Sequence, residues 1–265
     1  MKADARFNFP PWFEAILRDP ETRQPLQRRG DAYFRADNKC YPLQDGILSA
    51  VFPEALAGED ARWNRFYEKF APYYEWTQRV LGRWITGSDA TPEQLWRQDV
   101  IARLELPPAS RVLEVSPGPG TVQRLLRERI GEKGELAALD LSKNMLRLCR
   151  ERGDGNACLV HGNGQYLPFA DNSFDALFHF GGINLFNDPA KAIEEFVRVI
   201  KKDGILAWGD EGFSPSYPDG MKKKILTRIN PGYLRARPAI PDTVTDVKTY
   251  EVLFGLGYLV VGKKK

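Results

Sequence analysis

After residue 110 the chain alternates continuous apolar runs with amphipathic helical patterns, and no other feature of the sequence limits its fold as much. A short, continuous apolar run is typical of a strand buried on both faces of a parallel sheet. The segments between the runs repeat apolar residues at three- and four-residue spacings, as helices with one buried face do. The alternation predicts an α/β fold with a doubly wound, Rossmann-like sheet. The runs are RVLEVS (111–116), ELAALD (135–140), ACLVHG (157–162), FDALFHF (174–180) and GILAWGD (204–210).

Capping residues mark the helices between these runs. Ser142 and Asp188 are of N-cap type, and Pro189 follows at the first helical position, where proline is favoured. Gly131 ends the helical pattern that follows the first run. We therefore expect helices after each of the first two strands and before GILAWGD.

The first 105 residues have a different pattern. In residues 1–55, the stretch DAYFRADNKCYPLQDGI (31–47) alternates β-prone runs with turn signals and predicts a small β module. Residues 56–105 are helical and aromatic, and belong with the α/β domain of residues 56–265. Their apolar face either packs on its own domain or forms a lid over a cofactor or hydrophobic substrate. The residues of that face are Trp63, Phe66, Tyr67, Phe70 and Tyr74.

Charge and cysteine content exclude several classes of protein. The 38 basic and 35 acidic residues leave a net charge of +3, so no domain-wide positive field indicates nucleic acid or an anionic membrane. The basic runs 222–224 and 263–265 fit a solvated surface, or contact with phosphate or an acidic partner. Neither a signal peptide nor a stretch of roughly 18 apolar residues is apparent. Three widely spaced cysteines suit neither a disulfide framework nor a zinc site. We expect a cytoplasmic protein without a metal or a membrane span.

The turn SPGPG after the first strand predicts a ligand site. In a doubly wound sheet, ligands bind beyond the carboxyl ends of the strands, where the strand order reverses. Gly118 and Gly120 would let the main chain approach a ligand closely at the N-terminus of the next helix. Asp140 ends the second strand about 20 residues after Gly120, the distance at which a carboxylate reaches a ribose diol. A plain turn and a helix-start Asp140 remain the structural alternatives, but together the two features predict a nucleoside-type cofactor.

Four ordered segments resemble class I S-adenosylmethionine-dependent methyltransferases, most closely the branch that includes the ubiquinone and menaquinone biosynthesis C-methyltransferases. They are VLEVSPGPG (112–120), LAALDLSKNML (136–146), GNGQYLPFADNSFDALF (162–178) and FNDPAKAIEEFVRVIKKDGIL (186–206). The resemblance covers about residues 108–210. It implies S-adenosylmethionine as cofactor and a mostly parallel, seven-stranded sheet whose last strand is antiparallel. Residues 244–254 and 257–265 would be the closing pair of strands.

The same resemblance implies roles for individual residues. Ser116, in place of the usual first glycine, lies in the turn that holds the amino-acid and ribose parts of the cofactor, and Asp140 holds the ribose. Asn163 would accept a hydrogen bond from the adenine amino group. Phe180 and Gly181 would contact the methionine part, and Tyr74 would close over it. The implied cofactor residues are Tyr74, Glu114, Ser116, Gly118, Gly120, Asp140, Leu141, Asn163, Gly164, Gln165, Phe180 and Gly181.

The N-terminal segment resembles the Trm112-like, zinc-ribbon-derived module that is fused to some methyltransferases. The similarity lies in LRDPETRQPL (17–26) and CYPLQDGI (40–47). Members that bind zinc use cysteine pairs, whereas Asp19 and Pro20 stand in such a region here and Cys40 alone is left. The resemblance therefore implies a structural module without zinc ligands.

A methyl sulfonium is an activated donor, so orientation of the acceptor matters most and a general base is optional. His179 lies near the carboxyl end of FDALFHF and could accept a proton at neutral pH, or be buried against a helix. Asp210 and Glu211 follow the next strand, and either could act on an acceptor or cap the following turn. Asn184 is a polar candidate in the loop after the fourth strand. The candidate catalytic residues are thus His179, Asp210 and Asn184.

We expect an enzyme that methylates a small molecule. The Trm112-like module favours RNA as an alternative acceptor, although no basic stripe accompanies it. A non-catalytic scaffold that retains the fold is a third possibility, given the missing cysteines and the missing first glycine. Neither the acceptor atom nor the oligomeric state follows from the sequence.

Overall fold

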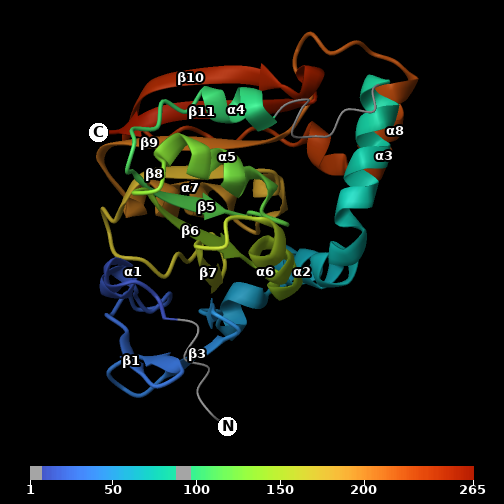
Figure 1. The fold of residues 1–265 in the computed structure, drawn as a ribbon. Helices are drawn as coiled ribbons and strands as arrows, with labels where there is room; N and C mark the ends of the chain where they lie inside the picture. The colour runs from blue at the N-terminus through green and yellow to red at the C-terminus, as the bar shows by residue number, and fades with distance from the viewer. Residues whose placement is uncertain (1–7, 88–96) are drawn as a thin grey trace.

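The computed structural model describes residues 8–87 and 97–265, and in these ranges one hydrogen-bonded sheet has the strand order β1-β2-β3-β4-β7-β6-β5-β8-β9-β11-β10 (Figure 1). The central strands β5 to β9 are parallel, and β5 pairs with both β6 and β8. The strand order therefore reverses at β5, as a doubly wound sheet requires. The strands are Gln27–Arg29 (β1), Ala32–Phe34 (β2), Cys40–Gln44 (β3), Ile47–Ser49 (β4), Arg111–Val115 (β5), Glu135–Asp140 (β6), Cys158–His161 (β7), Phe174–Phe180 (β8), Ile200–Glu211 (β9), Val244–Val252 (β10) and Gly257–Lys264 (β11).

The last strand, β11, is inserted between β9 and β10 and runs antiparallel to both, as predicted. The strand count differs from the prediction because the N-terminal strands extend the same sheet. Strand β4 pairs in parallel with β7, and the ladder continues where the amide of Ala50 donates to the carbonyl of His161 at 2.8 Å. This pairing covers the edge that β7 would otherwise present to solvent. The expected seven strands are therefore part of an eleven-stranded sheet.

Helices cover both faces of the sheet. One apolar cluster joins α4 and α5 to one face, whereas α7 and α1 pack on the opposite face. The predicted caps begin two helices: Ser142 Oγ accepts from the amide of Met145, and Asp188 Oδ1 accepts from the amide of Lys191. The helices are Pro11–Ile16 (α1), Gly58–Phe70 (α2), Tyr74–Thr86 (α3), Gln98–Ala102 (α4), Thr121–Ile130 (α5), Lys143–Arg152 (α6), Pro189–Val199 (α7) and Met221–Ile229 (α8).

Helices α2 and α3 extend away from the sheet, and α3 lies beside α8 at the right of Figure 1. They occupy most of the segment that was predicted to be a helical lid. Residues 88–96 of that segment lie outside the described residues. Among the helices of the described ranges, none has the length and apolar character that crossing a membrane requires.

Candidate functional site

A cleft lies beyond the carboxyl ends of β5, β6, β8 and β9, and α2 and α3 form its outer wall. It extends from the SPGPG turn, through the loop after β8, to the end of β9. This is the position at which doubly wound sheets bind ligands. The lining residues are Asp60, Trp63, Asn64, Tyr67, Tyr74, Gln78, Ser116, Gly118, Asp140, Leu141, Ser142, Met145, Phe180, Gly181, Gly182, Asn184, Leu185, Phe186, Asp210, Glu211 and Asn230.

The SPGPG turn forms one end of the cleft. Ser116 has φ of 59°, in the left-handed region that favours glycine, and its amide donates to the carbonyl of Leu139 at 2.8 Å. Gly118 also has a positive φ, and a Cβ atom there would meet no other atom within 4 Å. Gly118 thus leaves the main chain open toward the cleft, whereas Ser116 holds a glycine-like conformation with a side chain.

Gly120 has a different place from the one predicted. A Cβ atom there would come within 2.9 Å of Gly153 Cα and 3.0 Å of Cys149 Sγ, so Gly120 allows close packing against the end of α6. It is not among the residues that line the cleft. The geometry gives Gly120 a structural role and leaves Gly118 as the glycine of the turn that faces the cleft.

Asp140 lies at the same end of the cleft, where its carboxylate spans two loops. Oδ2 accepts from the amide of Gly118 at 3.2 Å, and Oδ1 accepts from the amide of Ser142 at 2.9 Å. Burial raises the pKa of Asp140 to about 6, although the hydrogen bonds from Ser142 and Gly118 oppose the shift. Each oxygen retains a lone pair beyond these contacts, so the carboxylate can still accept from a ligand hydroxyl. Leu141, which follows it, also lines the cleft.

Asp60, near the start of α2, was not identified from the sequence. Its Oδ2 accepts from Gln165 Nε2 at 2.6 Å, Asn187 Nδ2 at 2.9 Å and Asn163 Nδ2 at 3.0 Å. Oδ1 accepts from the amide of Asn187 at 3.1 Å. Asp60 is buried, and both of its carboxylate oxygens accept hydrogen bonds. These bonds connect α2 to the loops after β7 and β8.

Asn163 and Gln165, which were predicted to hold adenine, are hydrogen-bonded to Asp60 and to each other. Asn163 Oδ1 accepts from the amide of Gln165 at 2.9 Å and from its Nε2 at 3.2 Å, so both of its acceptor positions are used within the protein. Gly164 is packed so closely that a Cβ atom would lie 3.1 Å from Phe186 Cζ. The geometry does not bring Asn163, Gly164 or Gln165 to the cleft surface.

Aromatic side chains line the middle of the cleft. Tyr74 and Phe180, both expected at the cofactor site, line the cleft together with Trp63 and Tyr67 of α2. Gly181, which follows Phe180, has a φ of 87°. Trp63 Nε1 is buried and makes no hydrogen bond to the described residues, and Asn64 Oδ1 is in the same situation. A buried donor and acceptor without partners are typical of a surface that receives a polar ligand.

Carboxylates form the other end of the cleft. The carboxylate of Asp210 accepts from the amides of Gly182 at 3.1 Å, Asn184 at 2.7 Å and Glu211 at 2.7 Å. The first two hydrogen bonds fix the loop after β8 to the end of β9. Glu211 Oε2 accepts from Asn230 Nδ2 at 2.5 Å. Burial, reinforced by the charge of Asp210, raises the pKa of Glu211 to about 7. A carboxylate in this state can gain or lose a proton near neutral pH.

Asn184, which was predicted as a catalytic candidate, also lines this end. Its Nδ2 donates to the carbonyl of Glu211 at 3.1 Å, so it holds the β8 loop against β9. Asn230 contributes to the same end from the C-terminal end of α8 and was not identified from the sequence. Its segment has no periodic or motif signal that relates it to the sheet.

His179 does not reach the cleft. It is fully buried between Phe186 and Phe196, and its Nδ1 lies 3.0 Å from the carbonyl of Val115. Burial lowers its pKa to about 4, so it is neutral near pH 7. The alternate positions of a strand face opposite sides, and His179 shares the side of Leu177, which packs under α7. Its position therefore fits a core residue and not a catalytic base.

Glu114 lies below the turn and is also outside the cleft lining. Burial raises its pKa to about 8, and its Oε2 makes no hydrogen bond to the described residues. Burial also raises the pKa of Tyr74, and the positive charge of Arg97, which is 7% exposed, opposes both shifts. Arg97 is thus a cationic neighbour of the turn that the sequence did not indicate.

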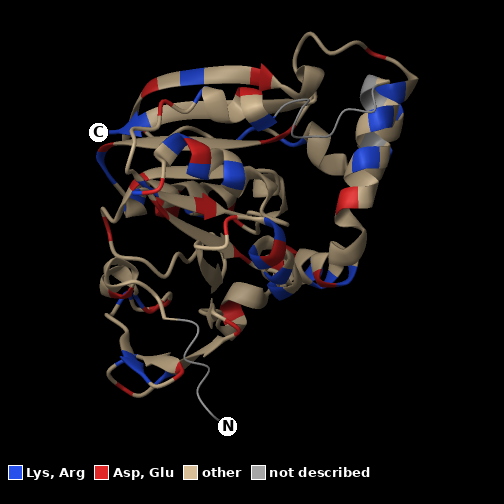
Figure 2. Ribbon diagram, viewed as in Figure 1, with Lys and Arg blue, Asp and Glu red and all other residues tan. Residues whose placement is uncertain are grey.

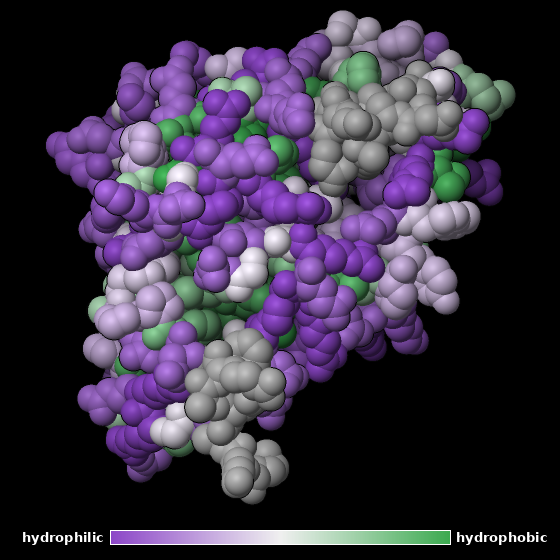
Figure 3. All heavy atoms as spheres, viewed as in Figure 1, coloured by the Kyte–Doolittle hydropathy of each residue, from purple (hydrophilic) through white to green (hydrophobic). Residues whose placement is uncertain are grey.

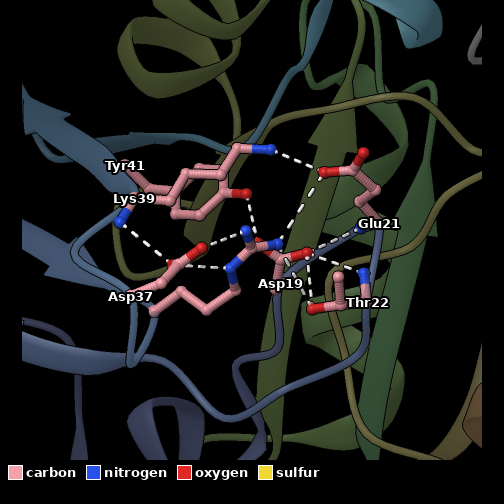
Figure 4. Close-up of polar contacts among 7 residues, drawn as sticks. Asp19, Glu21, Thr22, Asp37, Lys39 and Tyr41 are labelled. Atoms are coloured by element: carbon pink, nitrogen blue, oxygen red, sulfur yellow. Dashed lines mark hydrogen bonds and ion pairs between the residues drawn. The ribbon is translucent and has the colours of Figure 1, made fainter.

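In the N-terminal segment, ion pairs and hydrogen bonds connect Asp19, Asp37 and their neighbours (Figure 4). Asp19 accepts from the Tyr41 hydroxyl and lies 3.4 Å from Arg35 Nη1, while Arg35 also pairs with Asp37 at 2.5 Å. Burial would raise the pKa of Asp19, but hydrogen bonds from Tyr41 and the backbone outweigh it and lower the pKa. Across residues 8–87 and 97–265, no group of three or more His, Cys, Asp or Glu side chains is arranged to hold a metal ion.

Comparison with known proteins agrees with this architecture. Residues 113–208 match the family described as "Methyltransferase domain". Demethylmenaquinone methyltransferase of Geobacillus kaustophilus is 32% identical over 151 residues, which are 56% of this chain and 62% of that protein. The relative from Listeria welshimeri with the same description is 29% identical over 164 residues, which are 60% and 66% of the two chains. The match thus spans less than two thirds of the length of these relatives.

Solved structures share the fold at lower identity. Phosphoethanolamine N-methyltransferase 2 of Haemonchus contortus, in complex with S-adenosyl-L-methionine, has a TM-score of 0.56 at 16% identity over 80% of this chain and 61% of that chain. The sheet order, the cleft at the reversal of strand order and these matches together show that the chain carries a class I S-adenosylmethionine-dependent methyltransferase domain.

Proposed function

We propose that this protein transfers a methyl group from S-adenosylmethionine to a small-molecule acceptor bound in the cleft. The observation that carries the proposal is the convergence of Gly118, Asp140 and Phe180 on one cleft at the strand-order switch of a methyltransferase domain. The description of the relatives as demethylmenaquinone methyltransferases supports a small, quinone-like acceptor and the C-methyltransferase branch. The near-neutral charge of the chain gives no support to an RNA acceptor.

The residues at the turn suit the cofactor. Asp140 would accept hydrogen bonds from the ribose hydroxyls, and Gly118 would allow the main chain to approach. Leu141 and Met145 provide an apolar wall for the base, in place of the role expected for Asn163. Asn64 Oδ1 and Trp63 Nε1 offer a polar acceptor and a donor without internal partners. When bound, S-adenosylmethionine supplies an activated methyl group on a sulfonium.

The remaining cleft residues would position the acceptor and take up a proton. Tyr74 and Phe180 present aromatic faces, which favour a nearby cationic centre. Glu211, with a pKa of about 7, would accept the proton of a hydroxyl, amine or acidic carbon when the acceptor loses one. Asp210 and Asn184 would act by fixing the loop after β8, because their polar groups are engaged with backbone atoms.

We also propose that residues 1–55 are a Trm112-like module that stabilises the domain without a metal, and that residues 56–105 act as the lid. The ion pairs around Asp19 support the first part, and the cleft lining by α2 and α3 supports the second. Two buried thiols, Cys149 and Cys158, are compatible with a reducing cytoplasm.

Isothermal titration with S-adenosylmethionine and with S-adenosylhomocysteine tests the cofactor proposal. Asp140→Ala should weaken binding by about 10- to 100-fold, since it removes a charged hydrogen-bond acceptor. Glu151→Ala, at an exposed position on α6, serves as the matched control and should bind like the original protein. Absence of heat with both ligands in the unaltered protein at high micromolar concentration would overturn the proposal.

A further inference from the structure

An apolar stripe runs along the outer side of α3. Trp76, Val80 and Trp84 follow one another at four-residue spacing and are exposed, with Trp76 at 67%. Tyr74 and Gln78 are on the opposite side of the same helix, where they line the cleft. Because the cleft accounts for the inner side only, the outer stripe has no function in the proposed reaction.

Helix α8 carries a second stripe of the same kind. Met221, Ile225 and Ile229 are again four residues apart and are exposed, with Met221 at 71% and Ile229 at 65%. Leu226, on the inner side, is fully buried against Tyr233 and Leu256. The helix is therefore anchored by one side and presents the other, which is apolar, to the surroundings.

Basic side chains border both stripes. By helical position, Arg79 and Arg83 border the stripe of α3, and Lys222, Lys224 and Arg228 border that of α8. Figure 2 shows Lys and Arg along these helices at the right of the view. The Lys222 ammonium lies 5.8 Å from the centre of the Trp84 ring, which places the two stripes next to each other. Figure 3 shows hydrophobic residues among hydrophilic ones at this edge of the molecule.

The acidic residues of these helices are neutralised locally. Glu75 of α3 pairs with Arg152 at 2.8 Å, and Asp219, just before α8, pairs with Lys223 at 2.7 Å. Within α3 and α8 themselves, basic residues therefore outnumber acidic ones. The sequence allows the lysine run 222–224 to be either a solvated surface or a phosphate contact. In the structure this run adjoins exposed tryptophan, methionine and isoleucine side chains.

We propose that the outer sides of α3 and α8, here called the α3/α8 surface, bind the surface of an anionic membrane. Apolar side chains on one side of a helix with lysine and arginine at its borders are typical of helices that lie in the membrane interface. The apolar stripe enters the headgroup region, while the basic groups pair with lipid phosphates. A second copy of the chain would bring like charges together, and an acidic protein in water would leave the tryptophan and isoleucine side chains without an apolar partner.

The α3/α8 surface is adjacent to the cleft. The inner side of α3 contributes Tyr74 and Gln78, and Asn230, which directly follows α8, donates to Glu211. Membrane contact would therefore place the Glu211 end of the cleft near the lipid headgroups. The binding surface itself does not depend on the proposed methyl transfer.

Vesicle co-sedimentation of the full chain tests the proposal. We expect binding to vesicles of phosphatidylcholine with about one third phosphatidylglycerol, and weak binding to phosphatidylcholine alone, because the lysines need anionic lipid. Lys222→Glu/Lys224→Glu should weaken binding at least about tenfold. Met221→Ser/Ile229→Ser should also weaken it severalfold, because the apolar contact is lost. Lys133→Glu/Lys202→Glu makes the same charge change at exposed positions outside the surface and should bind like the original protein.

Equal binding of the unaltered protein to both vesicle types, or binding to neither, would overturn the proposal. Unchanged binding of the Met221→Ser/Ile229→Ser variant would do the same, as would an equal loss in the Lys133→Glu/Lys202→Glu control. Concentration-dependent dimerisation that the Met221→Ser/Ile229→Ser variant abolishes, without vesicle binding, would also contradict it. Titration of the same variants with S-adenosylmethionine is independent of lipid, so failure of the membrane proposal and failure of the cofactor proposal are distinguishable.

Discussion

Glu211 is the residue whose protonation is most directly connected to the proposed chemistry. Its pKa of about 7 lies above the ordinary range for a glutamate because burial and the charge of Asp210 both disfavour ionisation. Asn230 donates to Oε2 at 2.5 Å, and none of the residues that the structure describes donates a hydrogen bond to Oε1. The cleft therefore contains a carboxyl group with one oxygen available to an acceptor substrate.

We expect this group to control the pH dependence of methyl transfer. Only the ionised carboxylate accepts a proton, so kcat/KM should rise with pH and level off above an apparent pKa near 7. Glu211→Gln should lower kcat by about 100-fold and remove that inflection, because a base of this kind contributes roughly 10²- to 10⁴-fold. The pH profile of initial rates measures both effects. An unchanged inflection in Glu211→Gln, with affinity for S-adenosylmethionine retained, would show that another group titrates.

Ser116 illustrates a strained position in the cofactor turn. Its φ of 59° costs a residue with a Cβ atom on the order of 1 kcal/mol, which glycine avoids. Ser116→Gly should therefore raise the free energy of unfolding by about 0.5–1 kcal/mol in a denaturant titration, after the greater unfolded-state entropy of glycine is counted. Ser116→Ala keeps the Cβ atom and should give no such gain. A loss of stability in Ser116→Gly would mean that the serine hydroxyl contributes more than the backbone strain costs.

Several of the residues that line the cleft follow from local features of the sequence. Ser116, Gly118 and Asp140 follow directly from strand ends and turn chemistry, so their positions near the cleft could be predicted. His179 could not be placed in this way, because adjacent strand positions face opposite sides and only the packing of α7 decides which side holds the pocket. Asp60 makes its hydrogen bonds to residues 103 and 105 positions away, and such pairs leave no pattern in a single sequence.

Helix α2 is held at both ends by polar side chains, of which Asp60 is buried and Glu68 is half-buried. Asp60 fixes its beginning to Gln165 and Asn187, and near its other end Glu68 Oε1 accepts from Ser142 Oγ at 2.9 Å and from the amide of Asn144 at 3.1 Å. The apolar contribution of the helix is small, since its Phe66 is 46% exposed. Its attachment to the domain therefore depends on these hydrogen bonds more than on apolar packing.

Asp60→Ala should release α2 from the cleft. The substitution removes the Asp60 acceptor from the buried side-chain amides of Gln165 and Asn163, which costs about 2–4 kcal/mol. Hydrogen exchange should therefore accelerate in peptides from residues 58–70, while peptides from α7 change little. Glu59→Ala, at the neighbouring position, whose side chain is 41% exposed, is the control and should leave exchange unchanged. Equal acceleration in α2 and α7 would indicate global destabilisation and not release of the helix.

The predicted and observed elements differ most where strands that are far apart in the sequence pair with each other. The helices after β5 and β6 and the cap at Asp188 appear as their local signals indicate. In contrast, β4 is only three residues long and pairs with β7 more than 100 positions later. A strand so short carries no periodicity, so its parallel partner could not be inferred from the sequence.

This remote pairing makes the N-terminal strands part of the same cooperative structure as the methyltransferase sheet. Phe13 and Tyr41 belong to one apolar cluster with Leu113, Val160 and Phe196, which are core residues of the central strands and of α7. The ion pairs around Asp19 supply the polar contacts of the module without a metal (Figure 4). We therefore expect the two parts to unfold in one transition.

Phe13→Ala tests this coupling, because the fully buried ring packs against Phe169 with a centroid distance of 5.8 Å. Loss of such a ring costs roughly 3–5 kcal/mol, so Tm should fall by several degrees. Hydrogen exchange should accelerate in β9 and β11 as well as in residues 27–49, whereas Phe254→Ala, at a 63% exposed position, should change neither. Addition of a metal chelator should leave Tm of the unaltered protein where it was. Acceleration confined to residues 27–49, or a chelator-dependent Tm, would mean that the N-terminal module is an independent or metal-supported unit.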